Sequence, residues 1–332
     1  MQKNGVCVLP LQRALGDCFV SGTANASERP ERFGTLRFYV SCLISSCLLA
    51  LGFIAPKTAS AQYGYPGGYP YGPPTLSWVG KSAMPTQFVP DKVVVATDGK
   101  VYVVGGGYIN HATNTASSHL PYVYAYDPAT DTWTVKASLP TDRSDYAVAA
   151  GPNGKIYVLG GQIINQTRHL DLVEVYDTVS NSWSTGPTMP VGRFRPSAIA
   201  GLDGKLYIFG GTTVASDWDR HYEYAVDVLD PSTNTWSSGT PASTFNAKAD
   251  SAIACASDGT IYLHGNEVGQ AATILRCYSP STGIWTSKSS SPNPSASGSA
   301  CFGQIGLLYS RTELYGGYGV SRLARYNPAT DA

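Results

Sequence analysis

An octapeptide is written three times in this chain, about fifty residues apart. It reads GKVYVVGG at 99–106, GKIYVLGG at 154–161 and GKLYIFGG at 204–211. A tryptophan recurs with the same spacing, and a tyrosine follows each tryptophan at a nearly constant distance. A fixed period of this length indicates a repeat architecture, in which one small unit of structure is copied along the chain. The recurring tryptophans are Trp78, Trp133, Trp183, Trp236 and Trp285.

Each unit contains four short segments that have the composition of β-strands. The first strand, a, is small and apolar, as in YAVAAG at 146–151, and strand b is the run that ends in Gly-Gly. Strand c is exemplified by VEVYD at 173–177, and strand d carries the tryptophan. Dipeptides such as Asp98-Gly99 and Asn153-Gly154 stand between strands a and b. They predict two-residue hairpins in which both central residues have positive φ.

A four-stranded sheet with apolar residues on both faces is not stable alone. Several such sheets packed face to face around an axis bury both faces, which is the arrangement of a β-propeller. We therefore expect an all-β fold whose blades each have four strands. The tryptophan and tyrosine rings are expected to fill the space between blades. Glycine pairs should let neighbouring backbones approach closely; these are Gly105, Gly106, Gly160, Gly161, Gly210 and Gly211.

The combination of Gly-Gly after an apolar run, then a tyrosine, then a tryptophan seven residues later resembles the kelch repeat. The resemblance covers Thr75 to Asp331, and the fourth and fifth copies depart from it with GTIYLHGN and GLLYSRTE. It implies a kelch-type β-propeller of the galactose oxidase and kelch superfamily, in an exported protein of bacterial type.

Five units are visible, and the two ends of the chain complement each other. Residues Thr75–Ser82 have the character of a spare strand d, whereas the last unit stops at Ala332, just before its own tryptophan is due. We predict five blades, closed by a strand from the opposite terminus. A truncated propeller of six or seven blades is the alternative.

The first part of the chain has the organisation of a leader. Residues 32–61 contain Arg32 and Arg37, an apolar stretch and the small-residue pattern Ala59-Ser60-Ala61. They predict a secretory signal peptide cleaved after Ala61, with an uncleaved membrane anchor as the alternative. We interpret residues 1–31 as an over-extended gene start, 62–74 as a Gly/Pro/Tyr-rich linker and 75–332 as the propeller. The mature protein is then secreted or periplasmic and leaves the membrane.

Composition excludes some functions and limits cross-linking. Formal net charge is zero, so the chain has no basic footprint for nucleic acid. Of seven cysteines, only Cys255, Cys277 and Cys301 follow the predicted cleavage site. They permit at most one internal disulfide, and Cys255–Cys301 is the pairing that we would test first. We expect a monomer with no cofactor.

Function is expected on the face shared by the b–c and d–a loops. The b–c loops, at 107–121, 162–172 and 212–224, are long and differ from one another, as functional loops on a rigid scaffold do. They contain aromatic and titratable residues that could contact a ligand, namely His111, His119, His169, Trp218 and His221.

Three cations occupy one equivalent place at the entry to strand a. Arg143, Arg193 and Lys248 would lie around one mouth and attract a carboxylate or phosphate. The kelch resemblance implies similar ligands, because kelch domains that bind acidic peptides use arginines in this region and kelch proteins similar to sialic-acid mutarotases handle acidic sugars. The structural alternative is that arginine is a common repeat residue here and hydrogen-bonds neighbouring turns.

We therefore interpret the chain as a binding module for an acidic sugar or acidic peptide. The ligand contacts would come from Arg143, Arg193 and Lys248, with Trp218, His221 and His169 providing shape. A carbohydrate-acting enzyme, similar to a sialic-acid mutarotase or to galactose oxidase, is the alternative on the same scaffold. Asp217 and Asp219 near His221 could serve as acid or base. The histidines lack metal-ligand spacing, so no metal and no catalytic residue are assigned.

Overall fold

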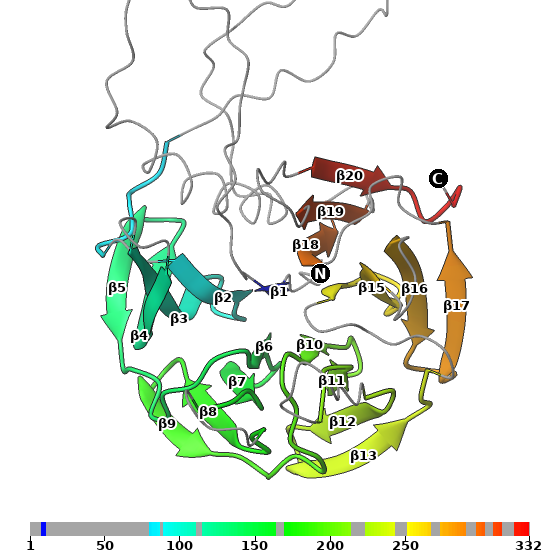
Figure 1. The fold of residues 1–332 in the computed structure, drawn as a ribbon, viewed down its shortest axis with the longest axis horizontal. Coiled ribbons are helices and arrows are strands. Elements are labelled where there is room, and N and C mark those ends of the chain that lie inside the picture. Colours follow the sequence, from blue (N-terminus) through cyan, green and yellow to red (C-terminus); the bar gives the residue numbers. More distant parts are fainter. Residues whose placement is uncertain are drawn as a thin grey trace, which may run out of the picture.

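The computed structural model describes eleven stretches of the chain. They are residues 8–10, 80–86, 89–110, 115–163, 169–213, 223–242, 251–266, 273–289, 297–302, 308–313 and 322–331. The regular elements within them are β-strands, and the sheets stand around a common axis (Figure 1). Within the same stretches there is no helix of the length and hydropathy that a membrane span needs.

The strands form five antiparallel sheets, called blades one to five. Blade one contains β2 (Val89–Val95), β3 (Val101–Asn110), β4 (Thr115–Asp127) and β5 (Thr132–Lys136). Blade two contains β6 (Ala147–Ala150), β7 (Lys155–Leu159), β8 (Val173–Asp177) and β9 (Ser182–Thr185). Blade three contains β10 (Ser197–Ala200), β11 (Leu206–Phe209), β12 (Val226–Asp230) and β13 (Thr235–Gly239).

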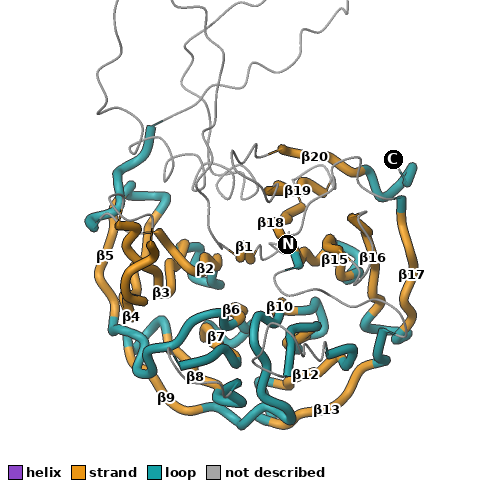
Figure 2. The backbone as a smooth tube through the Cα atoms, viewed as in Figure 1, coloured by secondary structure: helices purple, strands orange, loops and turns teal. Residues whose placement is uncertain are grey.

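The last two blades follow in chain order. Blade four contains β14 (Ala252–Cys255), β15 (Ile261–Asn266), β16 (Thr273–Ser279) and β17 (Ile284–Lys288). Blade five contains β18 (Ser297–Phe302), β19 (Leu308–Glu313) and β20 (Arg322–Tyr326). In addition, β1 (Val8–Pro10) pairs with the inner edge of β2. These sheets confirm the predicted all-β propeller of four-stranded blades, and Figure 2 shows the strands succeeding one another from the axis outward.

Small residues lie nearest the axis, as the strand-a pattern predicted. The innermost strands β6, β10 and β14 read AVAA, SAIA and AIAC and are almost entirely buried. β10 packs beside both β6 and β14. Because inner strands of successive blades converge, only small side chains let them approach this closely.

The strand-b tyrosines are buried between blades, which confirms the predicted packing. Tyr102 of blade one meets Tyr176 of blade two with ring centroids 5.9 Å apart, and Tyr207 of blade three meets Tyr278 of blade four at the same separation. Aromatic rings at this separation attract one another beyond the area that they bury. The buried core is therefore made by pairs of blades.

Each described tryptophan ties its blade to the one before it. The indole N–H of Trp183 donates to the carbonyl of Ala137 at 2.8 Å. Equivalent bonds join Trp133 to Ser82, Trp236 to Pro187 and Trp285 to Thr240. Every accepting carbonyl stands four residues after the preceding tryptophan of the repeat. The tryptophan therefore hydrogen-bonds the neighbouring blade in addition to packing against it. Trp78 lies outside the described residues.

The hairpins between strands a and b differ from the prediction. Gly99 has φ +78°, but Asp98 is absent from the residues with positive φ. Gly99 N–H bonds to Ala96 O, and Ala96 N–H bonds to Lys100 O, which describes a three-residue loop with glycine at the left-handed position. The predicted two-residue turn was wrong, because Asp98 does not adopt positive φ and instead accepts hydrogen bonds through its side chain. Its carboxylate accepts bonds from Lys100 N and from the Tyr102 hydroxyl.

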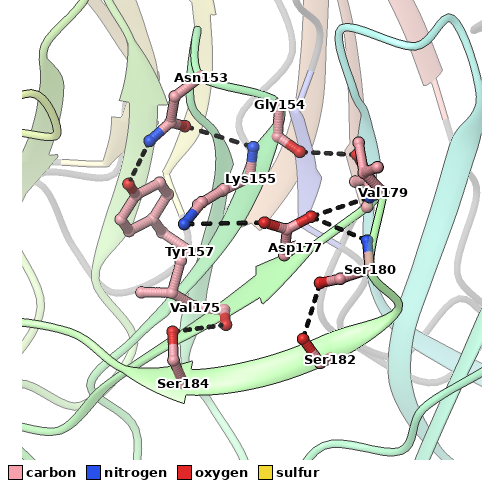
Figure 3. Close-up of polar contacts among 11 residues, drawn as sticks. Asn153, Gly154, Lys155, Tyr157, Val175, Asp177, Val179, Ser180, Ser182 and Ser184 are labelled. Atoms are coloured by element: carbon pink, nitrogen blue, oxygen red, sulfur yellow. Dashed lines mark hydrogen bonds and ion pairs between the residues drawn. The ribbon is translucent and has the colours of Figure 1, made fainter.

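The turns between strands c and d lie on the same face as the a–b hairpins and have related contacts. In blade two, Asp177 accepts bonds from the backbone N–H groups of Val179 and Ser180 and lies 3.7 Å from the Lys155 ammonium (Figure 3). Asn181 is left-handed at φ +53°, and its side-chain oxygen accepts from the Tyr176 hydroxyl. Left-handed residues also stand at the equivalent places, Asp131, Asn234, Gly283 and Asp331.

The glycine pairs stand where two blades touch, as predicted. At Gly160 (φ +68°) a Cβ would lie 2.6 Å from the Arg193 carbonyl of blade three, and at Gly161 (φ +92°) it would lie 2.4 Å from the Ser144 carbonyl. A side chain at either place would collide with backbone. Positive φ recurs at the other pairs, Gly105, Gly106, Gly210 and Gly211.

The predicted Cys255–Cys301 disulfide is wrong, because Cys255 is a free thiol. Side chains alternate along β14, so Ala254 and Ala256 face Leu308 of blade five whereas Cys255 packs against the core on the opposite side of the sheet. Burial raises the pKa of the Cys255 thiol to about 11. Cys277 is also a free, buried thiol.

Closure of the ring stays a prediction, but one described residue bears on it. Ser82 stands four residues after Trp78 and contacts blade one as Ala137 contacts blade two. Its N–H bonds to Asp131 Oδ1, as the Ala137 N–H bonds to Asn181 Oδ1. Ser82 therefore has the contacts of a residue that leaves strand d of a preceding blade. Among the described strands, β20 is the outermost strand of blade five.

We expect deletion of residues 75–82 to destabilise the protein more than deletion of 62–74. The first deletion removes the Ser82 bonds to Asp131 and Trp133 together with the predicted outer strand. At about 1 kcal/mol for each hydrogen bond, the loss is at least about 3 kcal/mol in the free energy of unfolding. Urea unfolding of both variants measures this, and equal stabilities would contradict closure by this segment.

Candidate functional site

Short backbone bridges confirm which loops share a face. Ser144, in the d–a loop before blade two, pairs with Gln162, and Gln162 pairs with His169 at the end of the b–c loop. In blade three, Phe194 of the d–a loop pairs with Thr212 at the start of the b–c loop. The d–a and b–c loops therefore extend one end of each blade, which we call the loop face.

Arg143 lies inside blade two and not at its surface. The side chain is 2% exposed, and its Nη1 donates to the carbonyls of Gly160 at 2.8 Å and Leu172 at 3.0 Å. Its Nη2 donates to Val158 O and forms an ion pair with Glu174 at 2.8 Å. Burial lowers the pKa of Arg143, and the Glu174 carboxylate opposes that effect.

Arg193 repeats this arrangement in blade three. It is fully buried, donates to the carbonyls of Gly210 and Ala225, and is paired with Asp227. Burial raises the pKa of Asp227, and the arginine opposes that effect. Both arginines therefore satisfy carbonyls where strand b ends and strand c begins, and each is paired with an acid of its own blade. This geometry corresponds to the structural alternative for these two residues.

Glu174 and Asp227 were not predicted as partners of the arginines, although their position in strand c indicates such a role. Each is an acid between two valines inside strand c, at the second residue of VEVYD and VDVLD. In blade one the equivalent of the arginine is Phe88 and the equivalent of the acid is Tyr124. The pair is present in blades two and three and absent from blade one, as expected of two charges buried together. In blade four, Lys248 stands at the place of the arginine and Arg276 at that of the acid, so the pair is not kept there.

Arg195 presents a guanidinium at the loop face. It stands two residues before the innermost strand β10, and its side chain is 33% exposed. Its Nε pairs with Asp145 Oδ1 at 2.9 Å, and its guanidinium lies 4.8 Å from the centre of the Phe194 ring. Arg195 and Asp145 both have left-handed backbones, at φ +56° and +57°. Such conformations cost energy in residues other than glycine and cluster at functional sites.

His169 lies beside this group and is 8% exposed. Its ring stacks on Phe194 with centroids 5.5 Å apart and planes 16° from parallel. Neither ring nitrogen has a hydrogen-bond partner in good geometry. Burial lowers the pKa of His169, while the nearby backbone of Thr212 and Thr213 raises it in part.

His264 replaces a core residue at the same end of blade four. It occupies the place of Leu159 and Phe209 in the earlier repeats and is buried. Burial lowers its pKa to about 4. The imidazole is therefore neutral near pH 7 and behaves as part of the core.

Several predicted site residues lie outside the described residues, namely His111, Trp218, His221 and Lys248. His119 lies in β4, where only the backbone is described. In the part of the chain that the structure covers, no three His, Cys, Asp or Glu residues gather as a metal site would require.

Breaking the Arg143–Glu174 pair should destabilise the protein strongly. Arg143→Met leaves the Glu174 carboxylate buried without its cation, so we expect a loss of about 3–5 kcal/mol in the free energy of unfolding. The double variant Arg143→Phe/Glu174→Tyr copies blade one and should lose less. Urea unfolding gives both values. A single variant as stable as the parent would exclude this role for the pair.

Acid should destabilise the protein through His264. Its pKa is about 4 in the folded state and 6.5 in the unfolded chain, so the unfolded chain takes up the proton first. The contribution of neutral His264 is complete above pH 6.5 and is lost as the pH falls toward 4, by about 3 kcal/mol. His264→Leu should remove this part of the pH dependence. Denaturation midpoints measured from about pH 7.5 to 4 test it, and parallel curves for parent and variant would refute it.

A protein-family model described as the KLHDC2/KLHL20/DRC7 Kelch-repeats domain matches residues 91–317. Kelch-like protein 15 of Danio rerio is 37% identical over 91 residues, and its Homo sapiens counterpart is 35% identical over the same length. These matches cover 27% of this chain and 15% of each relative.

A solved structure of YjhT superposes with a TM-score of 0.54 at 17% sequence identity, covering 70% of this chain and 78% of the other. That likeness supports the propeller fold. The family model spans more than half of the chain, and its matched range contains the three glycine pairs and the repeat tryptophans other than Trp78. The chain therefore belongs to the kelch-repeat family.

Proposed function

We propose that the chain is an exported binding module, which holds an acidic sugar or an acidic peptide at the loop face of its kelch propeller. The proposal of export rests on the leader-like sequence of residues 32–61. The proposal that a ligand binds at the loop face rests on the contrast between the two ends of the blades.

The contrast between the two faces is the observation that carries the proposal. On the opposite end, which we call the turn face, the a–b hairpins repeat one pattern of backbone hydrogen bonds in blades one to four. The tyrosine bond of the c–d turn recurs in blades one, two and five. On the loop face, the b–c loops differ in length and sequence. Repeated turns are explained by folding alone, whereas long loops on a rigid scaffold are where ligand-binding residues are most often found.

The proposal of an acidic ligand rests on cations at the loop face, but the residues that would supply the charge differ from those predicted. Arg143 and Arg193 are neutralised by Glu174 and Asp227, so they contribute little field outside the blade. Arg195 is paired with Asp145 and partly exposed, and Lys248 stays a candidate from the sequence. An exposed guanidinium binds carboxylates through charge-assisted hydrogen bonds.

The ligand class can be tested by thermal denaturation of the full chain in the presence of matched pairs. The pairs are glucuronate with glucose, and a glutamate-rich peptide with a glutamine-rich peptide. An acidic member should raise the midpoint, because binding to the native state stabilises it by about 2.7 kcal/mol at one hundred times Kd. Equal midpoints within both pairs would refute an acidic ligand.

A further inference from the structure

We infer that Asn153 is a site of spontaneous deamidation in the folded protein, and that blade two accommodates the aspartate that the reaction leaves. Asn153 is exposed in the hairpin between β6 and β7 and precedes Gly154. An asparagine side chain reacts with the next backbone nitrogen most readily before glycine, because glycine has no side chain to obstruct the approach. The site lies on the turn face and does not depend on the proposed ligand.

The reaction consumes water and releases ammonia. The backbone nitrogen of Gly154 forms a bond to Cγ of Asn153 and gives up its proton, while Nδ2 takes up a proton and leaves as ammonia. This step closes a succinimide ring. Water then breaks the ring at the bond from Cγ to nitrogen, which gives aspartate, or at the bond from the main-chain carbonyl carbon to nitrogen, which gives isoaspartate.

The groups around Asn153 favour the first step. The Lys155 backbone N–H donates to Oδ1 at 3.3 Å and would stabilise the negative charge that forms on this oxygen during the attack (Figure 3). Nδ2 donates to the Tyr157 hydroxyl at 2.9 Å. Once Cγ has been attacked, this nitrogen has a lone pair that can accept the Tyr157 proton. Burial raises the pKa of Tyr157, and the bond to Asn153 lowers it in part, so the hydroxyl carries its proton at neutral pH.

The other repeats show that aspartate fits this position. Asp98 accepts a hydrogen bond from the Tyr102 hydroxyl at 2.8 Å, and Asp203 accepts one from the Tyr207 hydroxyl at the same distance. Each carboxylate also accepts the backbone N–H two residues further on. After deamidation of Asn153, the tyrosine of blade two would donate its hydroxyl proton to the new carboxylate and so make the same bond.

Isoaspartate fits less well, because it adds a methylene group to the main chain. Both backbone groups of Gly154 are already engaged. Its N–H donates to Gly151 O at 3.3 Å, and its carbonyl accepts from Thr178 Oγ1 at 2.7 Å. We therefore expect aspartate to be the main product in the folded protein, whereas the denatured chain should form both products.

The experiment follows the peptide that contains Asn153 by mass spectrometry while the full chain is kept at neutral pH, either folded or in urea. Synthetic peptides identify aspartate and isoaspartate by their chromatographic retention. In the folded chain we expect Asn153 to become aspartate. Asn181, which precedes serine in the c–d turn of the same blade, should keep its amide and is the internal reference. A folded chain that keeps the Asn153 amide while the denatured chain loses it would overturn the inference, and so would isoaspartate as the main folded product.

Two variants test the contacts that favour the reaction. Tyr157→Phe keeps the ring in the core and removes the hydroxyl, so it should slow deamidation of the folded chain about tenfold or more and leave the rate in urea unchanged. Asp98→Asn copies the site into blade one, beside Lys100 N and the Tyr102 hydroxyl. Position 98 should then lose its amide as Asn153 does. An unaltered folded rate for the first variant, or a stable amide in the second, contradicts the role given to these contacts.

Asn153→Asp tests directly whether the hairpin accepts the product. This variant should unfold at the same urea concentration as the parent or at a higher one, because a hydroxyl bonds more strongly to a carboxylate than to an amide. Asn153→Gln is the matched control, since it keeps an amide on a longer side chain that closes the ring far less readily. If Asn153→Asp unfolds at a lower urea concentration than the parent, blade two does not accommodate aspartate and that part of the inference is wrong.

Discussion

The hydrogen bond from each tryptophan to a carbonyl of the preceding blade is the contact on which the propeller depends. It appears at Trp133, Trp183, Trp236 and Trp285, always with an acceptor four residues after the previous tryptophan. In blade two, the turn residue Asn181 adds a second tie, since its oxygen accepts from Tyr176 of its own blade and from Ala137 of the blade before. Stability is thus assembled from contacts between neighbouring units, as in other repeat proteins.

A second constraint operates inside the blades, where buried arginines close the ends of strands b and c. Arg143 collects three carbonyls and one carboxylate, and Arg193 collects two carbonyls and one carboxylate. The glycine pairs make room for the next blade at the same place. Because the arginines join strands b and c by hydrogen bonds at this end of the blade, the sequence of the following loops can vary without loss of the sheet.

The fold class, the repeat unit and the buried tyrosines could be predicted, because a fifty-residue period and alternating apolar strands leave few other solutions. The hairpin type was mispredicted, since an Asp-Gly dipeptide indicates a turn but does not reveal that Asp98 will bind Tyr102. The Cys255–Cys301 disulfide failed because side-chain alternation in β14 turns Cys255 away from blade five. Counting cysteines carries no information about which face each one occupies.

For the candidate site too, part of the arrangement could be predicted from the sequence and part could not. The sequence alone determined that cations recur at the entry to strand a and that the variable loops share their face, since both follow from position within a repeat. Only the tertiary structure decided which cation is exposed. Arg143 and Arg193 meet acids 31 and 34 residues further along the chain, whereas Arg195 lies on an aromatic ring at the surface. Burial and pairing depend on residues that are distant in sequence and adjacent in space. The sequence therefore gives the charge of a side chain, but not whether that charge is buried and paired.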